Sequence, residues 1–267
     1  MSVITISRGS YSHGKAIAEK VADKLGYECV AREILLEASK EFNIPELKLF
    51  HAIHDAPSIL NHFIYGKEKY IAYIQATLLK HLQKDNVVYH GFAGHFFVKH
   101  IPHVLKVRVT ADLKDRIRIV RDRDRVSQKE ALRLIIKLDD QRKKWGVQLY
   151  GIDTSDPNLY DLVVHVRKIT EEDAADIICN TVGLEHFQTT SESQQAIDDL
   201  CLADNVRAAL IKLKPDIDVS AQNGVVDIKT REMESKEWEL VQNMENIAAR
   251  IPGAKGINFH VLPYITD

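Results

Sequence analysis

The sequence predicts an α/β fold with a parallel sheet covered on both faces, followed by a small α+β module. Two observations lead to this prediction. Strand-like runs alternate with helical runs up to residue 182, which is typical of a parallel sheet with crossover helices. In residues 197–267 the order changes to α-β-β-α-β, with no repeat of the first part.

The first part of the chain opens on a strand. Residues 2–7 form a β-branched run, and residues 14–25 place apolar side chains at helical spacing before Gly26. Further strands are predicted at 86–90, 104–110 and 159–166, and further helices at 31–42, 67–83, 112–144 and 170–182. Thr170, followed by three acidic residues, is the expected N-cap of the last helix.

The second part follows a polar stretch without periodicity, residues 188–195, which is interpreted as a linker. The predicted domains are therefore 1–187 and 197–267, with the linker at 188–196 between them. Helices are predicted at 197–213 and 235–251, with Ser235 as a cap, and strands at 217–221, 225–230 and 256–262. Asn223-Gly224 between two of these strands is a strong hairpin signal.

The composition excludes several classes of protein. A chain of 267 residues that is 45% hydrophobic can bury a core, which excludes wholesale disorder. Three widely spaced cysteines exclude a disulfide framework and a cysteine zinc site, and they favour a reducing compartment. No apolar run approaches the ~18 residues of a membrane span. The N-terminus begins directly with a strand, so no signal peptide and a cytoplasmic location are expected.

The net charge of −2 conceals two differently charged segments. Residues 1–187 carry 28 Lys and Arg against 25 Asp and Glu, whereas residues 188–267 carry 8 against 13. The near-neutral total excludes a globally basic nucleic-acid binder. The acidic second segment makes direct binding to an anionic membrane surface unfavourable.

A phosphate-binding loop is predicted directly after the first strand. Residues 9–16 (GSYSHGKA) match the pattern G-x-x-x-x-G-K between a strand and a helix. Such a loop turns backbone N–H groups toward phosphate oxygens at the positive end of the following helix. The residues predicted to bind the phosphates of ATP are Gly9, Ser10, Ser12, His13, Gly14, Lys15 and Ala16.

Lys15 is the predicted catalytic lysine of this loop, because a lysine here bridges the terminal phosphates of a nucleoside triphosphate. Ala16 follows it, where such loops place a Ser or Thr whose hydroxyl holds Mg²⁺. The Mg²⁺ expected with ATP is then held through water and the phosphates, or binds poorly.

Residues 106–144 form a basic segment, with 14 Lys and Arg against 7 Asp and Glu. One interpretation is a solvated, self-paired helix, because residues 121–125 alternate in sign. Another is a lid whose arginines neutralise a transferring phosphoryl group. A nucleic-acid patch is disfavoured, since no aromatic-rich groove accompanies the charges.

Histidines are frequent between residues 51 and 103, and His51 and His54 lie three positions apart. There is no H-E-x-x-H pattern and no cysteine at ligand spacing, so no protein metal site is predicted.

Residues 1–185 resemble the cytidylate kinase-like family of nucleoside monophosphate kinases. The resemblance is carried by Ile4–Arg8, Ile17–Lys20, Leu25–Tyr27, Arg32–Leu35, Asp139–Arg142, Tyr150-Gly151 and Leu159–Val163. It implies a three-layer P-loop kinase fold with core, monophosphate-binding and lid segments. It also implies phosphoryl transfer from ATP to CMP or dCMP.

The resemblance further implies roles for individual residues. Gly9, Gly14 and Lys15 match the ATP-phosphate loop, Arg32 matches an arginine near the monophosphate, and Arg121, Arg125 and Arg142 stand where catalytic lid arginines are expected. Departures from the family pattern occur at Ala31, His90 and Phe92, where charged residues are usual. The alternative is therefore a nucleotide-binding sensor or regulatory protein with impaired catalysis.

The C-terminal segment resembles a BON domain, a small module associated with membrane or solute binding. Residues 223–228 (NGVVDI) and 251–257 (IPGAKGI) carry this resemblance, while Thr230 stands where a glycine is usual. The hypothesis for this module is a regulatory or docking role, in which it binds a ligand, a partner or a membrane, or docks onto the kinase segment. The sequence leaves oligomerisation open.

Overall fold

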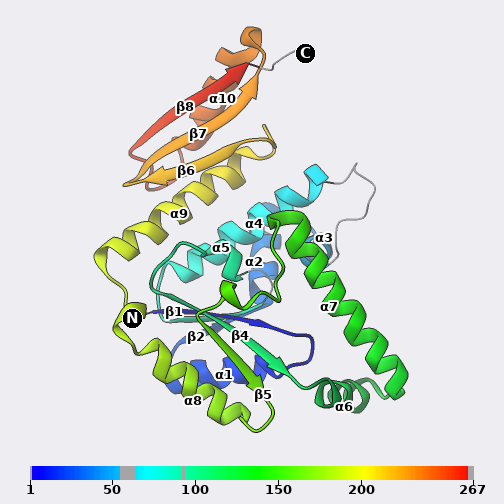
Figure 1. Cartoon of the computed structure of the whole chain (residues 1–267). Helices are drawn as coiled ribbons and strands as arrows, with labels where there is room; N and C mark the ends of the chain where they lie inside the picture. The colour runs from blue at the N-terminus through cyan, green and yellow to red at the C-terminus, as the bar shows by residue number, and fades with distance from the viewer. Residues whose placement is uncertain (1, 55–63, 92–93, 264–267) are drawn as a thin grey trace.

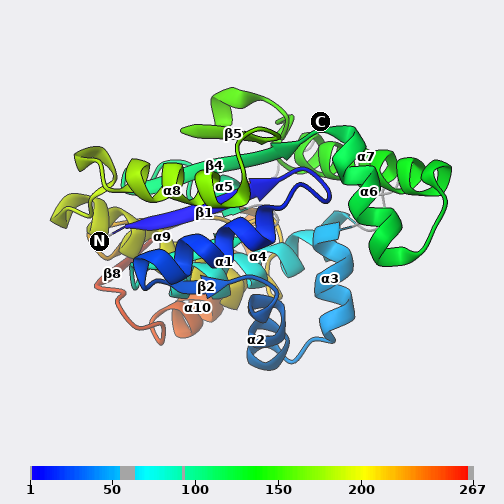
Figure 2. The ribbon, with the colours of Figure 1, turned by 90° about the horizontal axis from the view of Figure 1, so that it is seen from below.

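The computed structural model describes residues 2–54, 64–91 and 94–263. Its larger part is a parallel sheet between two layers of helices (Figures 1 and 2). In spatial order the strands are β2 (Glu28–Val30), β3 (Val87–His90), β1 (Val3–Arg8), β4 (Val104–Ala111) and β5 (Leu162–Val166). Every neighbouring pair is parallel. The predicted three-layer α/β architecture is confirmed.

Each face of this sheet has its own helices and its own hydrophobic core. One face packs against α1 (Gly14–Leu25) and α8 (Glu171–Val182). The other packs against α2 (Glu33–Phe42), α3 (Glu46–His54), α4 (Ile64–Leu82) and α5 (Gly94–Phe97). On β1, Ile4 and Ile6 belong to the core on the side of α1 and α8. Val3 belongs to the core on the side of α2–α5. Because both faces of the sheet are covered, successive side chains from Val3 to Ile6 are all buried.

The basic segment forms two helices, not the single helix predicted over 112–144. They are α6 (Leu113–Asp124) and α7 (Gln128–Tyr150), which project from the end of β4 (Figure 1). Arg125 ends α6 with a left-handed φ of 57°. Ser127 starts α7 with a capping box, in which its side chain and that of Glu130 satisfy each other's backbone N–H groups.

The C-terminal module has a three-stranded sheet with helices on one face. Its strands are β6 (Asp218–Gln222), β7 (Val225–Glu232) and β8 (Gly256–Pro263), and α10 (Glu234–Ala248) packs on them. The predicted hairpin at Asn223-Gly224 is confirmed, with φ of 53° and 83° at the two turn residues. Ser235 does not cap α10, whose N-cap is Met233 without a side-chain bond.

Within the predicted linker at 188–196, the expectation of irregular structure is wrong from Ser191 on, because α9 (Ser191–Leu210) begins there. Thr190 caps this helix in a reciprocal pair with Ser193, at 2.9 and 3.1 Å. Because this cap is made of polar side chains, the first turn of α9 has the amino-acid composition of a loop. Along α9, Ile197 and Cys201 join the core under α4, while Leu202, Val206 and Leu210 join that of the C-terminal module.

Asp199 on α9 fastens the hairpin of the C-terminal module. Its carboxylate accepts hydrogen bonds from the N–H groups of Asn223 at 2.7 Å and Gly224 at 2.8 Å, and the residue is 8% exposed.

Asp199→Ala should lower the free energy of unfolding of the full chain by about 1–3 kcal/mol, because two turn N–H groups lose their acceptor. Urea unfolding measures this loss. A loss no larger than that of the exposed control Asp218→Ala would contradict the prediction.

None of the helices within the described residues is long and apolar enough to cross a membrane.

Candidate active site

The loop after β1 lies at the carboxyl end of the parallel sheet, where α/β folds bind ligands. Its base is tied to β4: Gly9 N–H donates to the Val109 carbonyl at 3.1 Å, and the Ser12 hydroxyl lies 2.8 and 3.0 Å from the carbonyls of Gly9 and Val109. α1 begins at Gly14, so its unpaired N-terminal N–H groups stand at the end of the loop.

Gly14 is required by a close approach within this loop. A Cβ at this position would lie 2.8 Å from Cδ of Arg8. The Arg8 side chain therefore passes directly over the start of α1, which brings a cation to the phosphate-binding end of the helix.

The loop offers few ligands for Mg²⁺. The hydroxyl of Ser12 is engaged by backbone carbonyls, whereas that of Ser10 is buried with no hydrogen-bond partner among the described residues. Asp139 on α7 lies beside it, since its carboxylate accepts from the Ser10 N–H at 3.1 Å. Over the described chain, no three His, Cys, Asp or Glu side chains are grouped to hold a metal. This set fits a Mg²⁺ held mainly by nucleotide phosphates and water.

Two cavities meet at this loop. The first, here named the α2–α4 cavity, has a volume of about 520 Å³ and includes Arg8, Lys15, Arg32, Ile74, His90 and Arg142 in its lining. The second, here named the loop cavity, has about 190 Å³ and includes Arg8, Gly9, Arg108, Arg116, Asp139, Arg142 and Lys143. Arg8 and Arg142 line both cavities, so two cations that are distant in sequence separate the two spaces.

Arg142 is a buried cation within this arrangement. Its guanidinium donates to the Arg8 carbonyl across 134 residues of sequence. Burial and the positive charge of Arg8 lower the pKa of Arg142 to about 10, and Arg108 and Arg116 add to this effect. The Arg142 side chain remains charged at neutral pH, and its neighbourhood carries excess positive charge. A phosphate in either cavity would relieve this repulsion.

Lys15 and Arg32 are at the open side of the α2–α4 cavity. The Lys15 side chain is 65% exposed and pairs with Glu19 at 3.5 Å. Arg32, just before α2, donates to Glu46 at 2.7 and 3.0 Å, with its guanidinium 5.9 Å from the Phe50 ring. Both predicted residues therefore face the same space.

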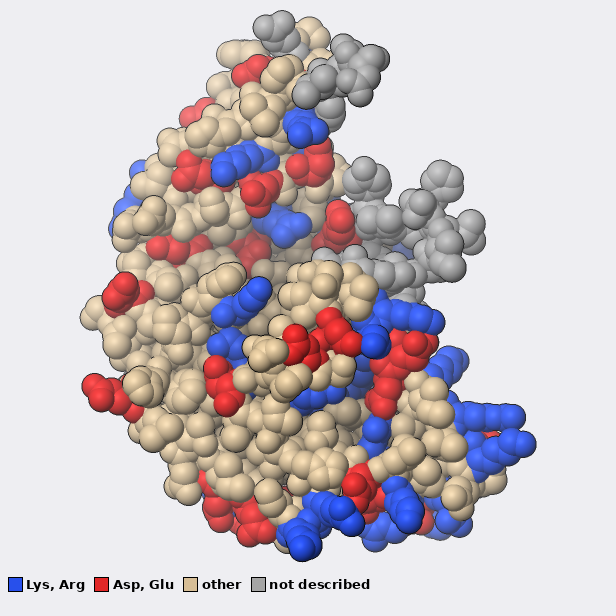
Figure 3. Space-filling view, viewed as in Figure 1, with Lys and Arg blue, Asp and Glu red and all other residues tan. Residues whose placement is uncertain are grey.

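The other predicted lid arginines lie elsewhere. Arg121 and Arg125 are exposed at the end of α6 and line neither cavity within the described structure. Figure 3 shows the basic side chains gathered over α6 and α7. Arg8 and Arg116 were not predicted from the sequence as site residues. The Nε atom of Arg116 donates to the Ser10 carbonyl at 2.6 Å. Arg8 was noted only within the stretch Ile4–Arg8 that carries the family resemblance, and Arg116 only as one cation of the basic segment.

His90 ends β3 and lines the α2–α4 cavity. It is 6% exposed, and its Nδ1 atom has no hydrogen-bond partner among the described residues. Burial, with Arg8 nearby, lowers the pKa of His90 to about 4, so the imidazole is neutral at physiological pH. It thus offers the cavity a hydrogen-bonding group without a charge, where a carboxylate was expected from the family pattern.

His13 connects the loop to two helices. Its Nε2 lies 2.6 Å from Asp115 on α6, and its Nδ1 lies 2.7 Å from Glu171 on α8. Both ring nitrogens can donate only in the protonated imidazolium. Burial alone would lower the pKa of His13, but the bonds to the two carboxylates outweigh this and raise it. The His13 ring, the predicted phosphate ligand, is committed to the protein, so only its backbone is left for phosphate.

The stability contributed by His13 should fall with rising pH. Because its folded pKa is raised, its contribution is fully present below the unfolded pKa of about 6.5 and is lost as pH rises through the folded value. His13→Asn removes the imidazole and tolerates the left-handed φ of 65°. In urea unfolding, wild type should exceed this variant most near pH 6, and the difference should shrink toward about pH 9. A constant difference over that range would contradict the prediction.

The sheet order, the G-x-x-x-x-G-K loop and the shared cation cluster together define a P-loop kinase, an enzyme of nucleotide phosphoryl transfer. The model of the cytidylate kinase-like family matches residues 3–168, and the chain belongs to this family. The family match ends before α9, so it covers the kinase segment alone.

Individual relatives agree with this assignment. The chain is 26% identical over 187 residues to a cytidylate kinase of Sulfolobus acidocaldarius, covering 70% of this chain and 97% of that protein. It is 28% identical over 194 residues to a cytidylate kinase of Pyrococcus horikoshii, covering 72% and 92%. The crystal structure of an uncharacterized protein from Eubacterium ventriosum is similar in fold, with a TM-score of 0.53 and 20% identity over 68% of this chain and 98% of that one.

Proposed function

We propose that this kinase transfers the terminal phosphoryl group of ATP to CMP or dCMP. The observation that carries the proposal is the α2–α4 cavity, in which Lys15 of the loop, Arg32 and Arg142 face one space of about 520 Å³. That volume suits a small-molecule ligand. The cytidylate kinases among the relatives support a pyrimidine acceptor.

In the proposed mechanism the donor phosphates lie on the loop N–H groups and on Lys15. Arg32 holds the phosphate of the acceptor in the α2–α4 cavity. An oxygen of that phosphate forms a bond to the terminal phosphorus of ATP as the bond to the bridging oxygen breaks, and ADP leaves. Arg8 and Arg142 neutralise the charge that is shared between the two phosphates.

Two further groups complete this proposal. Mg²⁺, when bound with ATP, adds charge neutralisation, and Asp139 with the Ser10 hydroxyl would hold it through water. Arg121 and Arg125 reach the phosphates only if α6 moves toward the loop, as expected of a lid. Both residues remain proposed lid cations.

A second candidate function is a nucleotide-binding sensor without turnover. Ala16 supplies no hydroxyl for Mg²⁺, and His90 is neutral where a charge was expected. A coupled assay with ATP, Mg²⁺ and a panel of CMP, dCMP, UMP, AMP and GMP separates the two functions. We expect turnover that is fastest with CMP or dCMP. Tight ATP binding in calorimetry with no turnover for any acceptor would instead establish the sensor.

We further propose that residues 1–187 are the kinase domain and residues 197–267 a BON-like domain that regulates it. The separate hydrophobic cores support this division. The packing of α9 against α4 as well as against the second core supports docking of the BON-like domain on the kinase within the same chain. The proposal does not require a membrane.

A further inference from the structure

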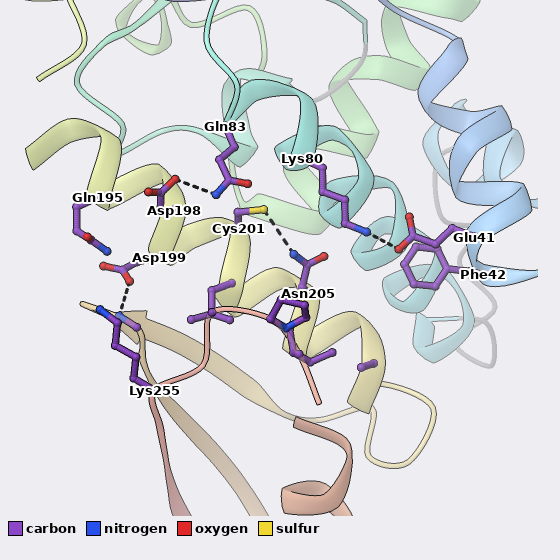
Figure 4. Close-up of a pocket in the computed structure, with 16 residues that line it drawn as sticks. Glu41, Phe42, Lys80, Gln83, Gln195, Asp198, Asp199, Cys201, Asn205 and Lys255 are labelled. Carbon is purple, nitrogen blue, oxygen red and sulfur yellow. Dashed lines mark hydrogen bonds and ion pairs between the residues drawn. The ribbon is translucent and has the colours of Figure 1, made fainter. Parts of the chain in front are cut away.

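A third cavity lies between the C-terminal module and the kinase core, away from the loop (Figure 4). This interdomain cavity has a volume of about 760 Å³. Its walls come from the ends of α2 and α4, from α9, and from the loops that precede β7 and β8. The lining includes Glu41 and Phe42 at the end of α2, Lys80 of α4, and Asn205 and Ala209 of α9.

The charged groups of this cavity are largely satisfied by the protein itself. Glu41 and Lys80 form an ion pair, and the carboxylate of Asp199 is occupied by the hairpin turn. Asp198 accepts a hydrogen bond from Gln83 at 2.8 Å. The charged residues of the lining are three carboxylates and two cations, so the lining carries a net charge of −1. They are Glu41, Asp198, Asp199, Lys80 and Lys255. Such a lining disfavours a polyanion such as a nucleotide.

The remaining polar surface suits an uncharged molecule. The amides of Gln83, Gln195 and Asn205 come from two sides of the cavity, and Phe42 supplies an aromatic wall (Figure 4). The amide groups of Gln83 and Asn205 each donate one hydrogen bond within the protein, to Asp198 at 2.8 Å and to the Cys201 Sγ atom at 3.5 Å, and each has a second N–H and a carbonyl oxygen besides. Amide side chains pair with the edges of nucleobases, and aromatic rings contact their faces. A neutral nucleoside matches this combination of amides, aromatic wall and low charge, and the volume lies within the range of small-molecule sites.

Two helices connect this cavity to the α2–α4 cavity. On α2, Ile34 in the first turn lines the α2–α4 cavity, and Phe42 at the end lines the interdomain cavity. On α4, Ile74 lines the former and Lys80 the latter. The helices are joined where Phe42 stacks on Tyr73 with ring centroids 4.1 Å apart. The two cavities are therefore connected by a continuous packed element, the kind of connection that can couple two binding sites.

We propose that the interdomain cavity binds an uncharged nucleoside and that this binding changes the affinity of the α2–α4 cavity for its acceptor. Binding of a nucleoside in the interdomain cavity does not depend on the proposed function. The effect of this binding on the α2–α4 cavity does rest on the proposed function, in which CMP is the acceptor. Since α9 forms one wall and contacts α4 through Asp204 and Gln75 at 2.7 Å, the C-terminal module takes part in the coupling.

Calorimetry on the full chain tests the site, with cytidine and adenosine as probes and CMP present in excess to fill the acceptor cavity. At least one nucleoside should bind the wild type. Ala209→Leu fills the cavity and should weaken this binding about 10-fold or more, while the same substitution at the exposed Ala249 should leave it unchanged. Asn205→Ala removes an amide without adding volume and should also weaken binding. This second variant tests the site even if Ala209→Leu fails to fold.

The site is overturned if neither nucleoside binds, or if Ala209→Leu and Asn205→Ala both bind as the wild type does. The coupling is measured as the Kd for CMP with and without the saturating nucleoside, and a change of about 5-fold or more is expected. An unchanged Kd for CMP overturns the coupling. Absence of any CMP binding is instead a failure of the proposed function, and the nucleoside titrations of the two variants still decide the site.

Discussion

Lys15→Ala is expected to lower kcat with ATP and CMP by about 100-fold or more, a loss typical of removing one charge-stabilising group from an active site. Lys15 is the cation of the loop that faces the α2–α4 cavity, and it pairs only weakly with Glu19 at 3.5 Å. In the proposed mechanism Lys15 interacts with the phosphates more strongly as charge develops during transfer, so kcat should fall more than the affinity for CMP.

Lys20→Ala is the matched control, since Lys20 is on the same helix and pairs with Glu172 at 2.9 Å, away from both cavities. It should retain kcat within about 3-fold of the wild type. Rates of the Lys15→Ala variant that equal those of this control would exclude Lys15 from the phosphoryl-transfer step.

Arg142→Met is expected to lower kcat/KM for CMP by about 100- to 1000-fold, because it removes the buried cation shared by the two cavities. Methionine keeps the length and the packing of the aliphatic part. The substitution removes the hydrogen bond to the Arg8 carbonyl and the attraction of Asp139, but it also relieves the repulsion from Arg8 and Arg108, so we expect only a moderate loss of stability. Steady-state kinetics measure the loss of kcat/KM, and thermal unfolding measures any loss of stability separately.

Lys144→Met on the same helix is the control for this substitution, because Lys144 pairs with Asp140 at 2.7 Å and lines neither cavity. If Arg142→Met keeps kcat/KM near that of Lys144→Met while its melting temperature is unchanged, the cation cluster has no part in catalysis. A variant that unfolds at assay temperature would show instead that Arg142 mainly supports the structure.

The fold was predictable where the local pattern is strong. The strand before the loop and the amphipathic helices follow from periodicity, and Asn223-Gly224 determines the hairpin. β2 was missed because it has three residues, Glu28–Val30, and is a strand only through its pairing with β3. The start of α9 was missed because its cap is made of Thr190 and Ser193, residues that are equally common in loops.

The candidate site was only partly predictable, since its residues meet across long sequence distances. The loop itself is a local motif and was found. The contact between Arg142 and Arg8 spans 134 residues, and the bonds of His13 to Asp115 and Glu171 span 102 and 158. No periodicity encodes such contacts. The resemblance identified Arg142, but the roles of Arg8 and Arg116 needed the three-dimensional arrangement.

The helix α9 has a consequence for the cooperativity of the molecule. One side of it completes the core beneath α4 through Ile197 and Cys201, and the other completes the core of the C-terminal sheet through Val206 and Leu210. Unfolding either core would leave one apolar side of α9 in water. We therefore expect the two regions to unfold together, so heat capacity scans should show one main transition, whereas two domains that shared no helix would give two.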